Sequence, residues 1–221
     1  MRVSRTFVVV SLVASVGAGC RSARPTTPQV AEPVVPLLQP GAPGAATRDV
    51  SVAAATDLSA VRVSAADAAF MQGMIGHHAQ AVEMVALIPS RSDNPQVALL
   101  GQRIDVSQTD EMALMRTWLS DRGLPQPDPH AHHNHDAALM PGMLTPEEMA
   151  RLQAARGPAF DRLFLEGMIR HHRGALTMVE TLFASPGAGQ ESEIYGFASD
   201  VDADQRMEID RMGAMLQEMS K

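Results

Sequence analysis

Phe70-Met71-Gln72-Gly73-Met74-Ile75-Gly76-His77-His78 is the most informative stretch of this sequence, because it occurs twice. The second copy is Phe164-Leu165-Glu166-Gly167-Met168-Ile169-Arg170-His171-His172. Each copy continues with alanine, methionine and valine at matching offsets: Ala81, Met84 and Val85, then Ala175, Met178 and Val179. A second duplicated set follows each copy: Asp105, Gln108, Glu111 and Met115, then Asp202, Gln205, Glu208 and Met212. Internal repetition of this kind predicts two copies of one helical hairpin.

The repeated residues fall on one face of each predicted helix. At about 100° of rotation per residue, the methionines, histidines and alanine of the first copy span a face roughly 140° wide. Gln80 and Glu83 are expected to point away from this face. The partner segments form matching faces from Gln108, Glu111, Met112 and Met115, and from Gln205, Glu208, Ile209 and Met212. Because these faces are the apolar ones, we expect them to turn toward the interior of a bundle.

Helix-capping residues mark where the segments begin. Ser64 with Asp67 resembles a capping box, Thr145-Pro146-Glu147-Glu148 is a fuller one, and Asn94-Pro95 opens a further helix. Gly157-Pro158 divides the third segment into a short helix and a long one. No stretch shows sustained alternation of polar and apolar residues, so no sheet is predicted. The sequence predicts an all-α fold, a four-helix bundle at 64–220 with hairpins at 64–122 and 145–220, turns at 89–94 and 185–190, and a His-rich loop at 125–143.

Four histidines on inward faces need partners, because burying an unpaired polar group costs up to several kcal/mol. The same faces carry methionines, and thioether and imidazole ligands together suit Cu(I). We therefore expect a metal centre, with copper favoured, formed by Met74, His77, His78 and Met84 with Met168, His171, His172 and Met178. A methionine stripe is more often core packing, and Met149, Met215 and Met219 fit that role.

The partner segments offer alternative ligands or groups that orient a ligand. They are Asp105, Gln108, Glu111, Asp202, Gln205 and Glu208. The two aspartates, one turn before the glutamines, are candidates to orient a histidine. Adjacent histidines lie about 100° apart on a helix, so each is expected to join ligands from another helix. Iron, manganese, zinc and nickel remain open, although the Glu-x-x-His pair typical of a di-iron bundle is absent.

A separate histidine cluster lies in the predicted loop between the hairpins. It consists of His130, His132, His133 and His135. Histidines at this density are typical of an exposed auxiliary chelator for Cu(II), Ni or Zn. A merely hydrophilic loop is the alternative interpretation.

The N-terminal region has the pattern of an exported and anchored protein. Arg2 and Arg5 precede an apolar run at 7–16 that is too short to span a bilayer, and small residues then precede Cys20. This predicts a signal peptide over 1–19 and lipidation of Cys20, which would attach the protein to a membrane of the cell envelope, periplasmic or at the surface. Plain secretion is the alternative. Cys20 and the following Pro- and Ala-rich residues up to 63 are expected to form a disordered tether.

Composition excludes several functions. The 221 residues carry a net charge of −7, which argues against nucleic-acid binding because phosphate affinity needs clustered Lys and Arg. A single cysteine, beside 15 methionines, excludes a disulfide framework and a thiolate zinc cluster. The absence of G-x-S-x-G gives no support to Ser-His-Asp catalysis. A metal ion is thus the expected partner, an enzyme is not favoured, and a homo-oligomer is left open.

The two motifs together resemble a known bacterial family. They are Phe-x-x-x-Met-Ile-x-His-His-x-x-Ala-x-x-Met and Gln-x-x-Glu-Ile/Met-x-x-Met. This pattern is similar to that of domain of unknown function 305, and the resemblance covers about residues 64–220. It implies a secreted or lipid-anchored helical protein with a ferritin-like fold. It also implies that the Met-x-x-His-His residues are the candidate ligands, since some relatives bind copper through such residues.

We therefore expect an extracytoplasmic copper-binding protein that serves in sequestration or tolerance. Two alternatives remain. One is a metal-dependent redox enzyme of ferritin-like type, using histidines with Glu111 and Glu208. The other is a metal-free envelope interaction module, in which the histidines form a hydrogen-bonded core.

Overall fold

The computed structural model describes residues 37–39, 47–55, 62–127 and 139–220, and the chain divides into two units, residues 1–56 and 57–221. In the first unit, strand β1 (Leu37–Gln39) pairs antiparallel with β2 (Arg48–Val50), and helix α1 (Val52–Ala55) follows. The prediction of no sheet is therefore wrong for this short ladder. Strands of 3 residues are too short for alternation to be visible in a sequence.

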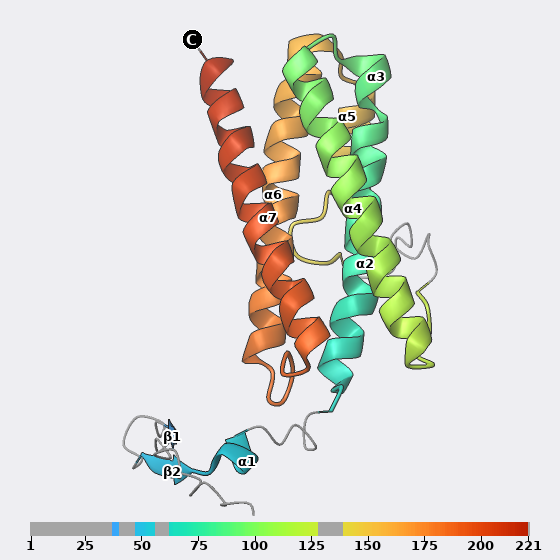
Figure 1. Ribbon diagram of the computed structural model, residues 1–221. Coiled ribbons are helices and arrows are strands. Elements are labelled where there is room, and N and C mark those ends of the chain that lie inside the picture. The colour runs from blue at the N-terminus through green and yellow to red at the C-terminus, as the bar shows by residue number, and fades with distance from the viewer. Residues whose placement is uncertain (1–36, 40–46, 56–61, 128–138, 221) are drawn as a thin grey trace, which may run out of the picture. The chain divides into compact units, whose positions relative to one another are not determined.

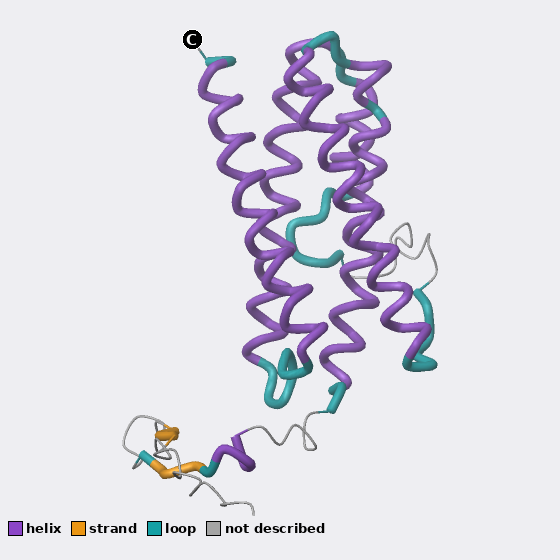
Figure 2. Tube along the Cα trace, viewed as in Figure 1, coloured by secondary structure: helices purple, strands orange, loops and turns teal. Residues whose placement is uncertain are grey.

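The second unit is built from helices, which confirms the all-α class. They are α2 (Ala65–Ala86), α3 (Ile88–Arg91), α4 (Pro95–Asp121), α5 (Pro146–Ala154), α6 (Gly157–Ala184) and α7 (Ser192–Glu218). Helix α2 packs against α4 and α6, and α6 packs against α7 (Figure 1). The second unit carries no strand in its described part (Figure 2). None of the helices described is long and apolar enough to cross a membrane.

The expected helix starts are present as hydrogen bonds. The Ser64 hydroxyl accepts from the Asp67 amide at 3.1 Å, and the Asp67 carboxylate accepts from the Ser64 amide at 2.7 Å. Thr145 and Glu148 form the same reciprocal pair at the start of α5. The first hairpin turn differs from the prediction, because its beginning is the short helix α3. A proline is accommodated there since the first turn of a helix needs no N–H bond.

Two apolar clusters fill the bundle, and polar residues separate them along every long helix. In α2 the polar stretch lies between Ile75 and Ala81, and in α6 it lies between Met168 and Ala175. These residues form a layer across the middle of the bundle, which we call the polar layer: His77, His78, Gln80, Gln108, His171, His172, Gln205 and Glu208, all buried, with the half-buried Glu111. The interior of the bundle is thus apolar, polar and apolar along its length.

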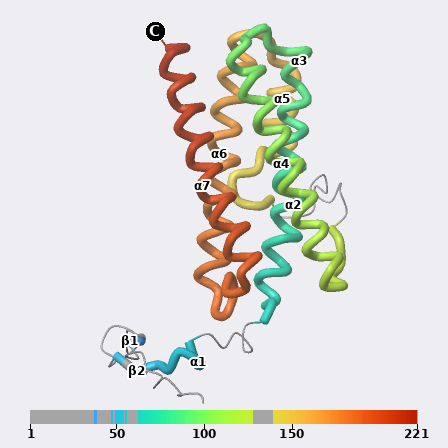
Figure 3. Tube along the Cα trace, viewed as in Figure 1, coloured from blue at the N-terminus to red at the C-terminus, as the bar shows by residue number. Residues whose placement is uncertain are grey.

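A segment at residues 139–144, here called the crossing loop, lies against α2 and α6 at the level of the polar layer (Figure 3, yellow). Its turn is closed by a hydrogen bond from the Met143 amide to the Met140 carbonyl at 3.2 Å. Gly142 has φ +76°, which the third position of a type II turn after proline requires. Gly174 of α6 lets the loop approach, because a Cβ there would lie 1.8 Å from the Pro141 carbonyl oxygen.

Candidate functional site

The centre of the polar layer is a contact between two histidines from different helices. The rings of His77 (α2) and His171 (α6) have centroids 3.8 Å apart and planes inclined by 34°. His77 Nε2 donates to the Pro141 carbonyl at 3.0 Å, and His171 Nε2 donates to the His77 carbonyl at 2.9 Å. Burial, followed by the neighbouring His78, lowers the pKa of His77 to about 3. Burial also lowers the pKa of His171 well below its usual value, so both rings are neutral at pH 7.

A histidine–carboxylate pair flanks this contact in each hairpin. His78 Nε2 lies 2.5 Å from Glu111 Oε2, and His172 Nε2 lies 2.7 Å from Glu208 Oε2. The second pair is the more deeply buried, because the Glu208 side chain is 3% exposed and that of Glu111 is 14% exposed. The two pairs occupy matching positions of the duplicated sequence. The duplication therefore produces two copies of one polar arrangement around the central pair.

Each of the four rings keeps one nitrogen available to a ligand. Carbonyl and carboxylate oxygens accept hydrogen bonds, so each Nε2 carries a hydrogen, and in the neutral form of the ring Nδ1 presents a lone pair. All four Nδ1 atoms are buried without a hydrogen-bond partner in the described structure. A buried polar atom left unpaired costs about 1–3 kcal/mol. An imidazole held through its other nitrogen by a carboxylate or carbonyl is also the usual form of a metal-binding histidine.

Methionines on the same helices accompany these rings, and two of them, Met84 and Met178, contact the other hairpin. Met74, Met84 and Met168 are fully buried. The Met84 methyl group of α2 lies against α6, 3.3 Å from where a Cβ of Gly167 would be. The Met178 methyl group of α6 lies at the same distance from the Cβ position of Gly73 in α2. These two contacts, Met84 with Gly167 and Met178 with Gly73, are called here the crosswise methionine contacts, because each joins a methionine of one repeat to the matching glycine of the other.

The donor set favours a soft metal. Within the described residues, no three side chains of the His, Cys, Asp and Glu types lie together as a metal site. The donors that remain are imidazole nitrogens and thioether sulfurs, which suit Cu(I), whereas iron and manganese prefer sites rich in carboxylates. The residues of the polar layer and their neighbouring methionines thus fit copper.

The partner helices contribute differently from the prediction. Asp105 is exposed, and Asp202 accepts two hydrogen bonds from Arg206 on the solvent side of α7. The aspartates do not orient the histidines, since the carboxylates bonded to His78 and His172 belong to glutamates one and a half turns further along each helix. The two matching glutamines are buried as expected, and their amide oxygens lack hydrogen-bond partners among the described atoms: Gln108 Oε1 and Gln205 Oε1.

Sequence reasoning missed the contribution of the crossing loop. Gln80, expected to point outward, is 4% exposed. Its amide donates to the Leu144 carbonyl at 2.9 Å and accepts from the Leu144 amide at 2.7 Å. The loop covers a face of α2 that would otherwise meet water, which is why a polar residue there is buried. The Pro141-Gly142 turn was the available signal, although it does not reveal which helix the loop contacts.

Several predicted residues lie outside the part of the chain that the structure describes. They are the lipidation candidate Cys20 and the loop histidines His130, His132, His133 and His135.

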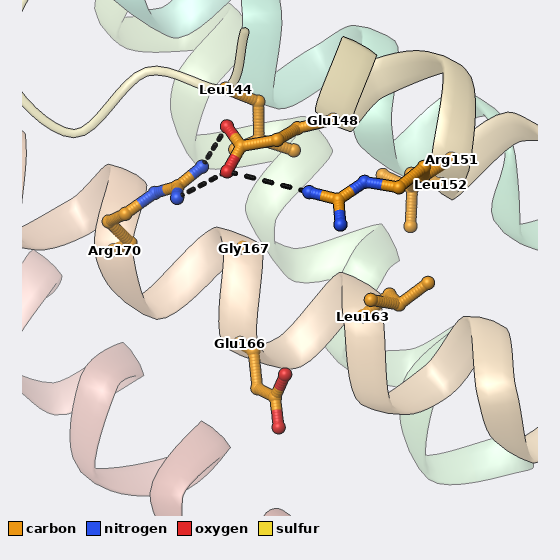
Figure 4. Close-up of a pocket in the computed structure, with 8 residues that line it drawn as sticks. All are labelled: Leu144, Glu148, Arg151, Leu152, Leu163, Glu166, Gly167 and Arg170. Carbon is orange, nitrogen blue, oxygen red and sulfur yellow. Dashed lines mark hydrogen bonds and ion pairs between the residues drawn. The ribbon is translucent and has the colours of Figure 1, made fainter.

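A pocket between α5 and α6 lies beside Gly167, where the Met84 methyl group contacts α6 (Figure 4). Arg170 donates to both carboxylate oxygens of Glu148, which lowers the pKa of that carboxyl group and raises the pKa of the guanidinium. Leu144 and Gly167 line the same pocket. This ion pair ties α5 to α6, while Leu144 covers the position where Met84 meets Gly167.

The fold and the site define a class of protein, an all-α helical bundle with a buried layer of histidines at the level of its middle. The chain belongs to the DUF305 family, a domain of unknown function, whose family model matches residues 67–216. The recognition made from the duplicated motifs is thereby confirmed.

Solved structures with the same fold include two other members of this family. A DUF305 fragment from Deinococcus radiodurans is 30% identical, with a TM-score of 0.62, and the match covers 71% of this chain and 98% of that one. A DUF305 protein from Streptomyces coelicolor, assigned as secreted, is also 30% identical with a TM-score of 0.62, covering 70% and 92%. CopM in a Cu(I)-bound form is 24% identical, with a TM-score of 0.54, covering 69% and 96%. No curated protein matches the chain.

Proposed function

We propose that this protein binds copper outside the cytoplasm and sequesters it within the bundle. The observation that carries the proposal is the set of four buried Nδ1 atoms without partners, beside fully buried thioethers. The fold shared with CopM, which has been solved in Cu(I)-bound and Cu(II)-bound forms, is consistent with it. The assignment of a 30% identical relative as secreted supports the location.

The ligands would come from both hairpins. Nδ1 atoms of His77, His78, His171 and His172 supply nitrogen, and the fully buried Met74, Met84 and Met168 supply sulfur. Bound copper contributes soft Lewis acidity that these neutral donors satisfy without added charge. The residues that hold Nε2 keep each ring in the ligating tautomer, and the apolar clusters on both sides exclude water.

Anaerobic Cu(I) titration against a competing chelator tests this function. The wild-type chain should bind with sub-micromolar affinity, and a variant with His77, His78, His171 and His172 changed to alanine should lose it. A milder variant, Met74→Leu with Met168→Leu, keeps the core volume and removes only sulfur. Its control is Met215→Leu, which packs at the edge of an apolar cluster. Unchanged affinity in the histidine variant would overturn the proposal.

A redox enzyme is less well supported by the arrangement. Glu111 and Glu208 each contact a different histidine, and no three acidic or histidine side chains converge in the described residues. Metal analysis of protein isolated from its native envelope separates the two functions. Iron or manganese in place of copper would favour the enzyme.

We further propose that Cys20 is lipidated after removal of residues 1–19 and that the following residues tether the bundle to a membrane of the cell envelope. The sequence before Cys20 supports this proposal. Cys20→Ser should move the protein from the membrane fraction to the soluble extracytoplasmic fraction. Membrane attachment that survives the substitution would contradict lipidation.

A further inference from the structure

The two crosswise methionine contacts, Met84 with Gly167 and Met178 with Gly73, are covered by different kinds of side chain. At Gly167, the Met84 methyl group is covered by Leu144, whose Cδ2 lies 3.3 Å from the Cβ position of that glycine. Met84 is fully buried and Leu144 is 4% exposed. The apolar side chain of Leu144 therefore covers the contact between Met84 and Gly167. The adjacent pocket is bordered by the Glu148–Arg170 pair (Figure 4).

At Gly73, the crossing loop provides a thioether instead of a leucine. The Met140 sulfur lies 3.5 Å from the Cβ position of Gly73, and the Met178 methyl group lies 3.3 Å from the same point. The Met140 methyl group lies 3.4 Å from the Cβ position of Gly76, one turn further along α2. Two thioethers from different parts of the chain thus lie against the face of α2 that carries Gly73, and the Met140 methyl group also lies close to Gly76.

Met140 is held in this place by the residues that follow it. Pro141 accepts a hydrogen bond from His77, Gly142 fits against Arg170 and Gly174, and Leu144 is bonded twice to Gln80. The loop is therefore anchored to α2 and α6 within four residues of Met140. Anchoring of this kind reduces the entropy lost when a ligand binds.

Exposure separates this pair from the other motif methionines. Met140 and Met178 are both half-buried, whereas Met74, Met84 and Met168 are fully buried. A thioether at the protein surface can meet a metal ion without opening the bundle. Two neutral sulfur donors select soft monovalent ions and discriminate against hard divalent ones.

We propose that Met140 and Met178 form a second soft-metal site, on the surface of α2 beside Gly73 and distinct from the polar layer, which binds Cu(I) or Ag(I). It builds on the proposed function, because it places an accessible site next to the buried one. The hydrogen bond from His77 Nε2 to the Pro141 carbonyl connects the two. At the matching position of the other repeat, Gly167, Leu144 takes the place of the second thioether, so we propose no site there.

Titration of the full chain with Ag(I), a redox-inert probe of Cu(I) sites, tests the assignment. Methionine methyl groups labelled with ¹³C report each thioether separately. The Met140 and Met178 signals should shift together in one step, and Met140→Leu with Met178→Leu should lose one equivalent of Ag(I). Leucine nearly conserves the volume of methionine. The control Met207→Leu removes a thioether that is 53% exposed on α7 and should keep every equivalent.

The outcomes separate this site from the polar layer. A double variant that binds as many equivalents as wild type would overturn the second site. Shifts confined to Met140 and Met178, with none at Met74, Met84 or Met168, would support this site and overturn the buried one. Absence of any binding by wild type would overturn both. Where the double variant loses helix content, the single variant Met140→Leu provides the same readout, because its side chain is half-buried in a loop.

Discussion

A buried histidine can bind a metal only through a nitrogen that carries no hydrogen, so the partner of its other nitrogen matters. In this protein two carbonyls and two carboxylates accept from the four Nε2 atoms. The same tautomer is thereby imposed four times, with the Nδ1 lone pairs left inside the bundle. The residues that contact the histidines are as important to the site as the histidines themselves.

The stability of the metal-free protein should fall as the pH drops from about 6.5 toward 3. The pKa of His77 is about 3 in the folded protein against an ordinary 6.5, and that of His171 is also strongly lowered. Between these pKa values the unfolded chain binds protons that the folded chain does not. Each such histidine therefore lowers the free energy of unfolding by up to about 1.4 kcal/mol for each unit by which the pH falls. Urea unfolding at pH 7 and pH 5 measures this loss.

The matched variant for that measurement is His77→Gln with His171→Gln, which removes both titrating groups. Its free energy of unfolding should depend less steeply on pH than that of wild type. Equal dependence in the two proteins would contradict the assignment of the effect to these rings.

Glu208→Gln should weaken copper binding by about 10–100-fold, the usual effect of removing a group that orients a ligand. The glutamine can still contact His172, but its amide oxygen is a weaker hydrogen-bond acceptor than a carboxylate oxygen. Glu166→Gln is the control, because that side chain is 53% exposed on the same pair of helices. Competition with a Cu(I) chelator gives both affinities, and equal affinities would contradict the role of Glu208.

At the scale of elements, the crossing loop is what makes the two repeats different. The long helices carry motifs that occur in both hairpins, whereas the loop has no counterpart in the second hairpin and lies against α2 and α6. It buries Gln80, supplies the acceptor for His77 and brings Met140 to Gly73. The contact at Gly167 is thereby covered by the buried Leu144, whereas the contact at Gly73 is covered by the half-buried Met140.

Gly174→Ala should destabilise the protein by about 1–3 kcal/mol or more, because overpacking forces the backbone to move. The added Cβ would lie 1.8 Å from the Pro141 carbonyl oxygen. Gly213→Ala should instead stabilise it by up to about 1 kcal/mol, since no atom beyond the adjoining residues and backbone of its own helix lies within 4 Å of the added Cβ, and glycine weakens a helix. Thermal unfolding compares the two variants. Changes of the same sign in the melting temperatures of the two variants would contradict this account of the loop.

At the scale of the whole molecule, the bundle is a compact unit separate from residues 1–56. The buried polar layer is enclosed by two apolar clusters that belong to this unit alone.

A fragment starting at residue 62 should therefore keep the thermal stability and the Cu(I) stoichiometry of a chain that starts at residue 20. The physical reason is that every described residue of the site and of both apolar clusters lies within it. Calorimetry and chelator competition compare the two proteins. A clear loss of melting temperature in the fragment would show that the N-terminal region contributes to folding.

Much of this architecture could be predicted from the sequence, because the signals are local or periodic. Capping boxes at Ser64 and Thr145 act within one turn of a helix. The inward faces follow from helical periodicity, and the duplication predicts that both hairpins present them. Four histidines and their methionines could thus be assigned to the interior before any contact was known.

The contacts between these faces depended on the tertiary structure. Helical spacing does not reveal that His77 meets His171, or that glutamates rather than aspartates hold the outer rings. The loop carries no periodicity, so its cover over Gln80 and the approach of Met140 to Gly73 could not be read from the chain. Periodicity assigns a residue to a face, but only packing brings residues distant in sequence within bonding distance.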